Sequence, residues 1–166
     1  MAKIISERPW LWATHLWNMF DFGCDARDEG GVKGRNNKGL VTFDRKTYKD
    51  AFYLYKAYWS DEPFVHLCSK RFARRTGDVA RIKVYSNAPS VTLMVNGKAF
   101  ATRKGDKVFT FDGVPLAKYT FITAVAGDCS DSMTLQQVAS PEQSYILPRD
   151  ASAANIAANW FNPDEQ

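Results

Sequence analysis

Polar residues suited to ligand binding stand inside an unusually apolar stretch near the start of the chain. The run from Leu16 to Phe22 is apolar except for Asn18 and Asp21. A strand buried on both faces has this nearly continuous hydrophobicity, and ligands gather at the carboxyl ends of such strands in a barrel of alternating strands and helices. The alternative is that Trp17 is only a core residue, because large aromatics are usually buried. Asn18 and Asp21 would then hold the following loop instead of binding a ligand.

The histidines and cysteines form no metal-binding pattern along the sequence. His15 and His66 are isolated, without a second ligand three or four residues away. The three cysteines, Cys24, Cys68 and Cys129, are widely spaced and lack a Cys-x-x-Cys pattern. This spacing argues against a disulfide framework and against a structural zinc site. The sequence therefore predicts free, mostly buried thiols, no metal and no cofactor.

Composition is typical of a water-soluble globular chain. The 166 residues are 45% hydrophobic and 24% charged, with a formal net charge of +4. The basic pairs Lys70-Arg71 and Arg74-Arg75 predict a solvated loop or strand edge better than a nucleic-acid site. No apolar run approaches the length of a membrane span. Residues 1–8 lack the apolar core of a signal peptide, which leaves the location open between cytoplasm and periplasm.

Loop, helix and strand patterns follow one another along the chain. Residues 23–39 are rich in Gly, Asp, Asn and Arg and predict a loop, and residues 40–43 form a short extended run. A helix is expected over 48–59, where apolar residues recur at helical spacing. After Pro63 the pattern changes to strands separated by turns, with a hairpin signal at Asn96-Gly97.

These patterns predict a mainly β fold in three parts. Residues 1–61 are expected to form a residual strand-loop-helix unit of a (β/α)8 barrel, and residues 62–139 an immunoglobulin-like antiparallel β-sandwich. Residues 140–166 are expected to be a tail with a short helix over Ala151 to Trp160.

Several separated motifs of the first sixty residues occur in a recognisable order. The stretches are Glu7-Arg8-Pro9-Trp10-Leu11-Trp12, Leu16-Trp17-Asn18-Met19-Phe20-Asp21-Phe22, the loop Arg35 to Lys46, Lys49-Asp50-Ala51-Phe52-Tyr53, Tyr55-Lys56-Ala57 and Trp59. Together they resemble the last strand-loop-helix unit of the catalytic barrel in glycoside hydrolase family 2. The following residues resemble the β-sandwich domain that comes after the barrel in many bacterial members. The resemblance implies the C-terminal part of a longer enzyme.

The resemblance implies a retaining glycosidase that works through a covalent glycosyl-enzyme. Such enzymes need two carboxyl groups roughly 5 Å apart, one a nucleophile and one an acid/base. The five glutamates stand in none of the family's catalytic motifs; they are Glu7, Glu29, Glu62, Glu142 and Glu165. We therefore expect no catalytic residue in this chain and no activity from the chain alone.

The resemblance also implies a set of substrate contacts. Trp17 corresponds to the aromatic that lines the sugar site, where the apolar face of a pyranose packs on a ring. Asn36 and Lys38 form an Asn-x-Lys pattern that contacts the sugar carboxylate in β-glucuronidases. Bacterial β-galactosidases with this kind of sandwich show a similar pattern. The expected substrate is thus a β-galactoside or related oligosaccharide, with β-glucuronidase activity as the alternative, and Asn18 and Asp21 complete the expected contacts.

A third possibility belongs to another class, a non-catalytic carbohydrate- or protein-binding module. An exposed aromatic platform on the sandwich would favour it. The sequence gives no clear sign of one, because the aromatics alternate as core positions do; they are Phe100, Phe109, Phe111, Tyr119 and Phe121. No nucleic-acid or membrane partner is expected. If the strand over residues 10–22 lacks neighbours, self-association through its exposed edge is expected.

Overall fold

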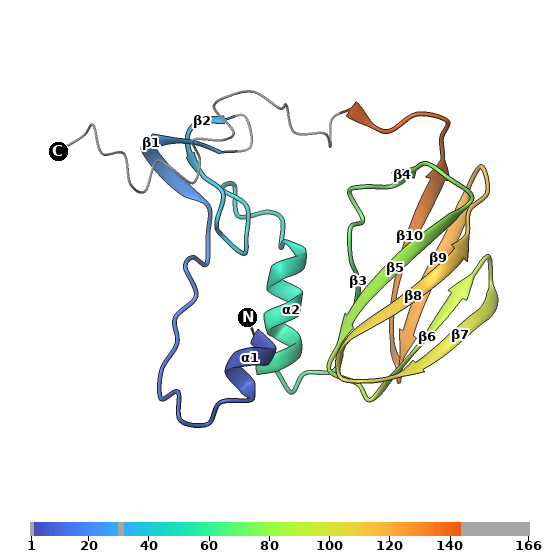
Figure 1. Cartoon of the computed structure of the whole chain (residues 1–166), viewed down its shortest axis with the longest axis horizontal. Coiled ribbons are helices and arrows are strands. Elements are labelled where there is room, and N and C mark those ends of the chain that lie inside the picture. Colours follow the sequence, from blue (N-terminus) through green and yellow to red (C-terminus); the bar gives the residue numbers. More distant parts are fainter. Residues whose placement is uncertain (1, 30–31, 144–166) are drawn as a thin grey trace.

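The computed structural model describes residues 2–29 and 32–143 (Figure 1). Two helices and ten strands occur in these ranges, so the protein is mainly β. The helices are α1 (Ala2–Ser6) and α2 (Asp50–Trp59). The strands are β1 (Phe22–Glu29), β2 (Val32–Asn36), β3 (Val65–Leu67), β4 (Arg74–Arg75), β5 (Val79–Ser86), β6 (Ser90–Val95), β7 (Lys98–Lys104), β8 (Lys107–Pro115), β9 (Thr120–Ala126) and β10 (Cys129–Gln137).

The strands form three sheets. β1 and β2 pair as an antiparallel hairpin, β3, β5 and β8 make a three-stranded sheet, and the five-stranded sheet has the order β4-β10-β9-β6-β7. The strand pairs are antiparallel except for the short parallel pair of β10 with β4. The predicted mainly β, antiparallel character is confirmed. α2 lies between the β1–β2 hairpin and the two larger sheets in Figure 1.

The two larger sheets contribute side chains to one buried core. Along β5, Ala80, Ile82 and Val84 are buried while the residues between them face away, because successive side chains of a strand point to opposite faces. The largest fully buried members come from both sheets and are Phe109, Phe111, Leu67, Ile82, Leu93, Ile122 and Leu135. Apolar burial of this extent is the main stabilising term of the fold.

The Asn96-Gly97 turn between β6 and β7 confirms the predicted hairpin. Both residues have positive φ, 49° for Asn96 and 78° for Gly97. Tight hairpin turns with a twist that matches their strands need this conformation at both central positions, and Asn and Gly adopt it most readily.

The prediction of a buried strand over Leu16 to Phe22 is wrong for this structure. Phe20 makes only an isolated parallel bridge with Val41. Trp10, Trp12 and Trp17 are 72%, 96% and 68% exposed. A buried parallel strand needs neighbours on both sides and cover on both faces, whereas here the segment has one short partner.

The predicted loop over residues 23–39 is also wrong, because β1 and β2 occupy most of it. Their pairing is irregular, with register shifts around Asp28, and Gly34 has a φ of 72°. The strands are rich in charged residues and glycine, so their composition hid them from a pattern based on hydrophobicity.

α2 confirms the expected helix over 48–59 and begins at Asp50. The residue before it, Lys49, makes no side-chain cap. The helix expected over Ala151 to Trp160 lies outside the described residues. Neither described helix has the length and apolar character needed to cross a membrane.

Candidate functional site

Asp21 is a buried residue that holds the loop around Gly39 in place. The residue is 4% exposed, and its Oδ1 accepts hydrogen bonds from the Gly39 backbone N–H at 2.9 Å and from Lys49 Nζ at 2.6 Å. A Cβ on Gly39 would lie 2.1 Å from the Asp21 nitrogen, so the close approach requires glycine. Of the two roles considered for Asp21, the geometry supports holding the loop.

Asn36 and Lys38 belong to one turn with different roles. Asn36 is 4% exposed, and its Oδ1 accepts a hydrogen bond from the Lys38 backbone N–H at 3.0 Å. The Lys38 side chain is exposed. A buried amide therefore shapes the turn, and the turn presents an ammonium group at the surface.

Asn18 lies beside this turn through backbone hydrogen bonds. Its N–H donates to the Lys38 carbonyl at 3.3 Å, and its carbonyl accepts from the Leu40 N–H at 3.0 Å. Its side-chain Oδ1 accepts from the Met19 N–H at 2.6 Å. The structure thus brings the neighbourhoods of Asn18, Asp21, Asn36 and Lys38 together, although the first two stand about twenty residues before the others.

Trp17 is adjacent to Asn18 and stays exposed. Its ring meets Phe22 edge-on, with 6.0 Å between ring centroids and an interplanar angle of 89°. The alternative that Trp17 is only a core residue is therefore wrong for this structure. An exposed indole can offer its face to the C–H groups of a sugar.

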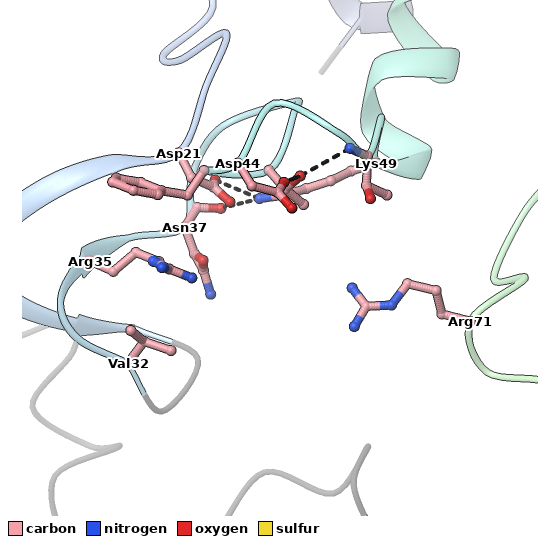
Figure 2. A pocket seen from close by; sticks show the side chains of 10 residues that line it. Asp21, Val32, Arg35, Asn37, Asp44, Lys49 and Arg71 are labelled. Carbon is pink, nitrogen blue, oxygen red and sulfur yellow. Dashed lines mark hydrogen bonds and ion pairs between the residues drawn. The ribbon is translucent and has the colours of Figure 1, made fainter.

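A neighbouring open cleft of about 770 Å³ carries several charges (Figure 2). It is lined by Asp21, Val32, Arg35, Asn37, Thr42, Phe43, Asp44, Thr47, Lys49 and Arg71. Of the predicted site residues only Asp21 lines it. Arg35 and Arg71 approach it from opposite sides in Figure 2, and the Arg35 guanidinium also lies 4.7 Å from the Phe43 ring centroid.

One acid at this cleft is held in its charged form. The Thr42 hydroxyl donates a hydrogen bond to Asp44, which together with the Lys46 backbone N–H lowers the pKa of that carboxyl. Arg35 and Arg71 line the cleft although the sequence did not predict them as binding residues. The available signals were the position of Arg35 at the start of the recognised loop motif and the place of Arg71 in a basic cluster, which predicted only a solvated loop or strand edge.

Three glutamates of the described chain are engaged in separate ion pairs. These pairs are Glu7 with Lys3 at 3.7 Å, Glu62 with Lys56 at 2.8 Å and Glu142 with Arg74 at 2.7 Å. Lys56 lowers the pKa of Glu62 through its hydrogen bond and charge. Lys56 therefore stabilises the ionised form of Glu62, which is the opposite of what a general acid needs.

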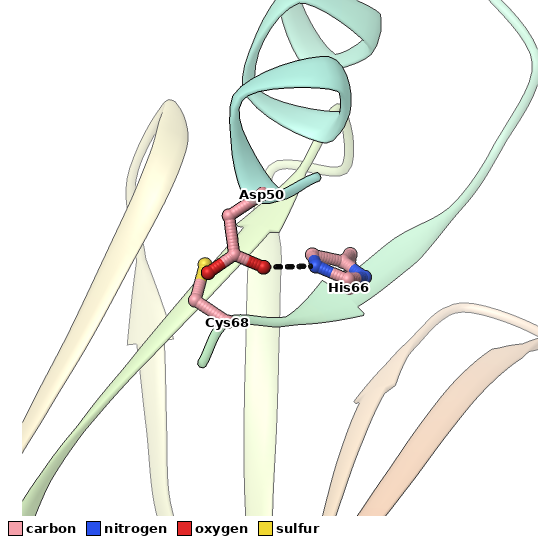
Figure 3. Close-up of side chains that lie close together, drawn as sticks. All are labelled: Asp50, His66 and Cys68. Carbon is pink, nitrogen blue, oxygen red and sulfur yellow. Dashed lines mark hydrogen bonds and ion pairs between the residues drawn. The ribbon is translucent and has the colours of Figure 1, made fainter. Parts of the chain in front are cut away.

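A metal-ligating group lies at the first residue of α2. Among the described residues, Asp50, His66 and Cys68 place one ligand atom each within 4.8 Å of one another (Figure 3). Burial opposes ionisation of Asp50, but hydrogen bonds with His66 and the Ser69 N–H outweigh it and lower its pKa.

The aromatics of the larger sheets divide into two sets. Phe109 and Phe111 are 2% and 0% exposed, as core positions should be. Phe100, Tyr119 and Phe121 are 38%, 60% and 50% exposed, so the prediction that they are core residues is wrong. Exposed aromatics, which a carbohydrate-binding module requires, are therefore present on the larger sheets. A binding-module function stays a prediction.

Comparison with known proteins identifies the chain's relatives. A β-glucuronidase of Bacteroides fragilis is 49% identical over 109 residues, which are 65% of this chain and 16% of that protein. A crystal structure of an FMN-binding β-glucuronidase from Faecalibacterium prausnitzii L2-6 matches 89% of this chain with 53% identity and a TM-score of 0.86. The chain belongs to glycoside hydrolase family 2. No family model matches it.

The family 2 relatives are much longer than the segment they share with this chain. The chain spans 23% of the F. prausnitzii structure and 12% of the β-galactosidase BoGH2A of Bacteroides ovatus, to which it is 24% identical over 104 residues. The recognised resemblance is confirmed, because the chain matches a segment of these family 2 enzymes.

Proposed function

We propose that this chain is the glucuronide-contacting segment of a β-glucuronidase. The observation that carries the proposal is the identity of 49% and 53% to the B. fragilis and F. prausnitzii β-glucuronidases, against 39% to a putative β-galactosidase of B. fragilis. The similarity thus favours β-glucuronidase activity over the expected β-galactosidase activity. The Asn36-x-Lys38 turn agrees with it, because an exposed ammonium suits an anionic sugar.

Each residue of the turn has a distinct part in this proposal. Lys38 contacts the sugar carboxylate, and buried Asn36 fixes the turn that presents it. Asp21 holds Gly39 and Lys49, which keeps the backbone beside Lys38 in place. Trp17 supplies an exposed ring for the apolar face of the pyranose.

The domain boundaries belong to the same proposal. Residues 1–61 correspond to the last strand-loop-helix unit of the (β/α)8 barrel of the longer enzyme, and residues 62–139 form an immunoglobulin-like sandwich that braces it. Residues 140–166 are a tail. The shared core of the two larger sheets supports the sandwich, since the inner faces of packed sheets supply such a core.

Catalysis itself comes from a carboxylate pair that this chain lacks. In the proposed enzyme a nucleophile and an acid/base remove the sugar by double displacement. The purified chain should therefore show no turnover of a chromogenic β-glucuronide or β-galactoside. Turnover that copurifies with the chain and scales with its concentration would contradict this.

Exchange of the segment into a relative tests the sugar preference. In the B. fragilis β-glucuronidase, the matching 109-residue segment is replaced by that of this chain. The chimera should hydrolyse a β-glucuronide in preference to a β-galactoside. Lys38→Met should raise KM for the glucuronide about tenfold to a hundredfold, as expected for a lost hydrogen bond to a charged group. The matched control is Lys46→Met, an exposed lysine that is not one of the expected substrate contacts. A preference for the galactoside would reject the proposal.

A second candidate function is binding of FMN. It rests on the 53% identity over 89% of this chain to the FMN-binding F. prausnitzii enzyme. The cleft with Arg35, Lys49 and Arg71 offers cationic groups suited to a phosphate. Titration of FMN into the chain, followed by flavin fluorescence, should saturate, and riboflavin should bind more weakly because it lacks the phosphate. Equal or absent responses to both flavins would reject this candidate.

A further inference from the structure

β3 presents two ligand-type side chains to α2. Val65 and Leu67 enter the core, so the alternate residue His66 lies on the opposite face, and Cys68 follows at the same spacing. Asp50, the first residue of α2, meets them there, as Figure 3 shows. A helix and a strand thus bring together one carboxylate, one imidazole and one thiol, the donor types that zinc prefers in proteins.

The distances between the three groups are close to those around a zinc ion. Asp50 Oδ1 lies 2.9 Å from His66 Nε2, and the three ligand atoms lie within 4.8 Å of one another. Zinc bonds of about 2.0–2.3 Å in a tetrahedron place ligand atoms roughly 3.5 Å apart. Small rotations of the side chains are therefore enough to form the site.

A carboxylate and an aromatic ring lie next to the imidazole. Asp131 Oδ2 lies 3.8 Å from His66 Nδ1, the ring nitrogen opposite the cluster. The Leu67 N–H donates to the same carboxylate at 2.7 Å and fixes it. The Tyr53 ring stacks on His66 with 3.6 Å between centroids and an interplanar angle of 8°. A carboxylate behind a ligating histidine sets its tautomer and orientation.

Solvent reaches the cluster through its exposed member, Asp50. His66 and Cys68 are 7% and 5% exposed, whereas the Asp50 side chain is 41% exposed. An open cleft of about 400 Å³ adjoins Asp50 and His66. An ion can therefore enter beside the carboxylate, and a water molecule can complete the coordination.

We propose that Asp50, His66 and Cys68 form a zinc site that fastens α2 to β3. A carboxylate oxygen of Asp50, Nε2 of His66 and Sγ of Cys68 are the protein ligands, and water is the fourth. On binding, the Cys68 thiol loses its proton to solvent, and the neutral imidazole carries its proton on Nδ1, toward Asp131. The proposal does not depend on the sugar specificity of the enzyme.

Proton release gives the site a pH dependence. Burial raises the pKa of the Cys68 thiol to about 12, so the thiolate forms at neutral pH only when a metal stabilises it. One proton released per ion makes the apparent affinity rise about tenfold for each unit of pH. The other titratable side chains around the cluster are Asp131, Lys70, Lys83 and Tyr85.

Cobalt(II) replaces zinc as a spectroscopic probe in the full chain. A Cys24→Ser/Cys129→Ser double variant retains Cys68 as its one cysteine. This variant should give visible d–d bands and a near-ultraviolet thiolate charge-transfer band, and stoichiometric zinc should abolish both. Absence of the charge-transfer band from this folded variant would overturn the proposal. That result would leave a hydrogen-bonded His66–Asp50 pair that only joins helix to strand.

Ligand variants test the assignment residue by residue. Cys68→Ser should remove the charge-transfer band, and His66→Gln should lower zinc affinity more than tenfold. Asp131→Asn should lower it about tenfold to a hundredfold, the usual effect of losing an outer carboxylate. His15→Gln is the matched control, because His15 lies outside the cluster and should leave affinity unchanged. Loss of binding in the control, with retention in His66→Gln, would also overturn the proposal.

Discussion

Lys49 Nζ lies 2.6 Å from Oδ1 of the buried Asp21, across 28 residues of sequence. The same ammonium donates to the Asn37 carbonyl at 2.8 Å. One lysine at the start of α2 therefore connects the helix to Asp21 and to the turn that carries Lys38. Loss of this ion pair should therefore change the position of the turn that we assign to substrate binding.

Loss of the Asp21 charge should destabilise the N-terminal part of the protein. Asp21→Asn leaves the Lys49 ammonium without its counter-ion, at a cost of about 2 kcal/mol, because the pair is only partly shielded from solvent. Urea unfolding followed by tryptophan fluorescence measures this, since Trp10, Trp12 and Trp17 report on the region. The control Asp112→Asn breaks the exposed pair with Arg81 and should change stability by less than about 0.5 kcal/mol.

A side chain at position 39 should not be tolerated. The added Cβ of Gly39→Ala would meet backbone atoms of Phe20 and Asp21 at 2.2 and 2.1 Å, so the two segments must separate. The expected loss is about 2–4 kcal/mol, with disruption of the Asp21 hydrogen bonds. Gly23→Ala is the matched control, because its nearest neighbour is 4.0 Å away. Equal melting temperatures for the two variants would contradict the geometry.

The exposed tryptophans should drive self-association. Trp12 is 96% exposed and Trp10 72%, and such apolar surface associates in water. Light scattering should show concentration-dependent association of the chain that Trp12→Ser reduces. Tyr119→Ser is the control, since that aromatic is also exposed but lies away from this segment. A chain that stays monomeric at every concentration would exclude this.

Residues 62–139 should fold without the rest of the chain. Their core is continuous across the two larger sheets, and a cooperative thermal transition is expected from the isolated segment. Phe111→Ala within it should cost about 3–5 kcal/mol, because that side chain is fully buried. A broad transition that sharpens only when residues 1–61 are present would show that the segment depends on them.

Stability should fall at alkaline pH because of Cys68. Its pKa rises from an ordinary value of 9.0 to about 12 in the folded protein, chiefly through burial. The folded state holds this proton more tightly than the unfolded state. The contribution of the Cys68 thiol to the free energy of unfolding is therefore complete below pH 9 and is lost as the pH rises toward 12. The pKa of Tyr85 is also raised to about 12 by burial and adds to the loss above pH 10. Urea unfolding in metal-free buffer at about pH 8 and pH 10.5 measures the decline, which Cys68→Val should diminish.

The sequence by itself determined the features that depend on local pattern. Alternation of apolar residues located β5 and β6, because side-chain direction in a strand is a local property. The Asn96-Gly97 pair located the hairpin turn between β6 and β7, because positive φ in a turn is also local. Helical spacing located α2 to within two residues. The ordered motifs around Trp17 and Lys38 gave the family.

Only the tertiary structure decided which residues meet. The apolar run before Phe22 looks like a buried strand, but burial depends on neighbours that the pattern cannot contain, and Trp12 is exposed. His66 looked isolated because its partners, Asp50 and Asp131, stand 16 and 65 positions away. Composition could not reveal the β1–β2 hairpin or the cleft between Arg35 and Arg71, because both arise from contacts between segments. Local preferences are encoded residue by residue, whereas a site forms from the path that packing gives to the whole chain.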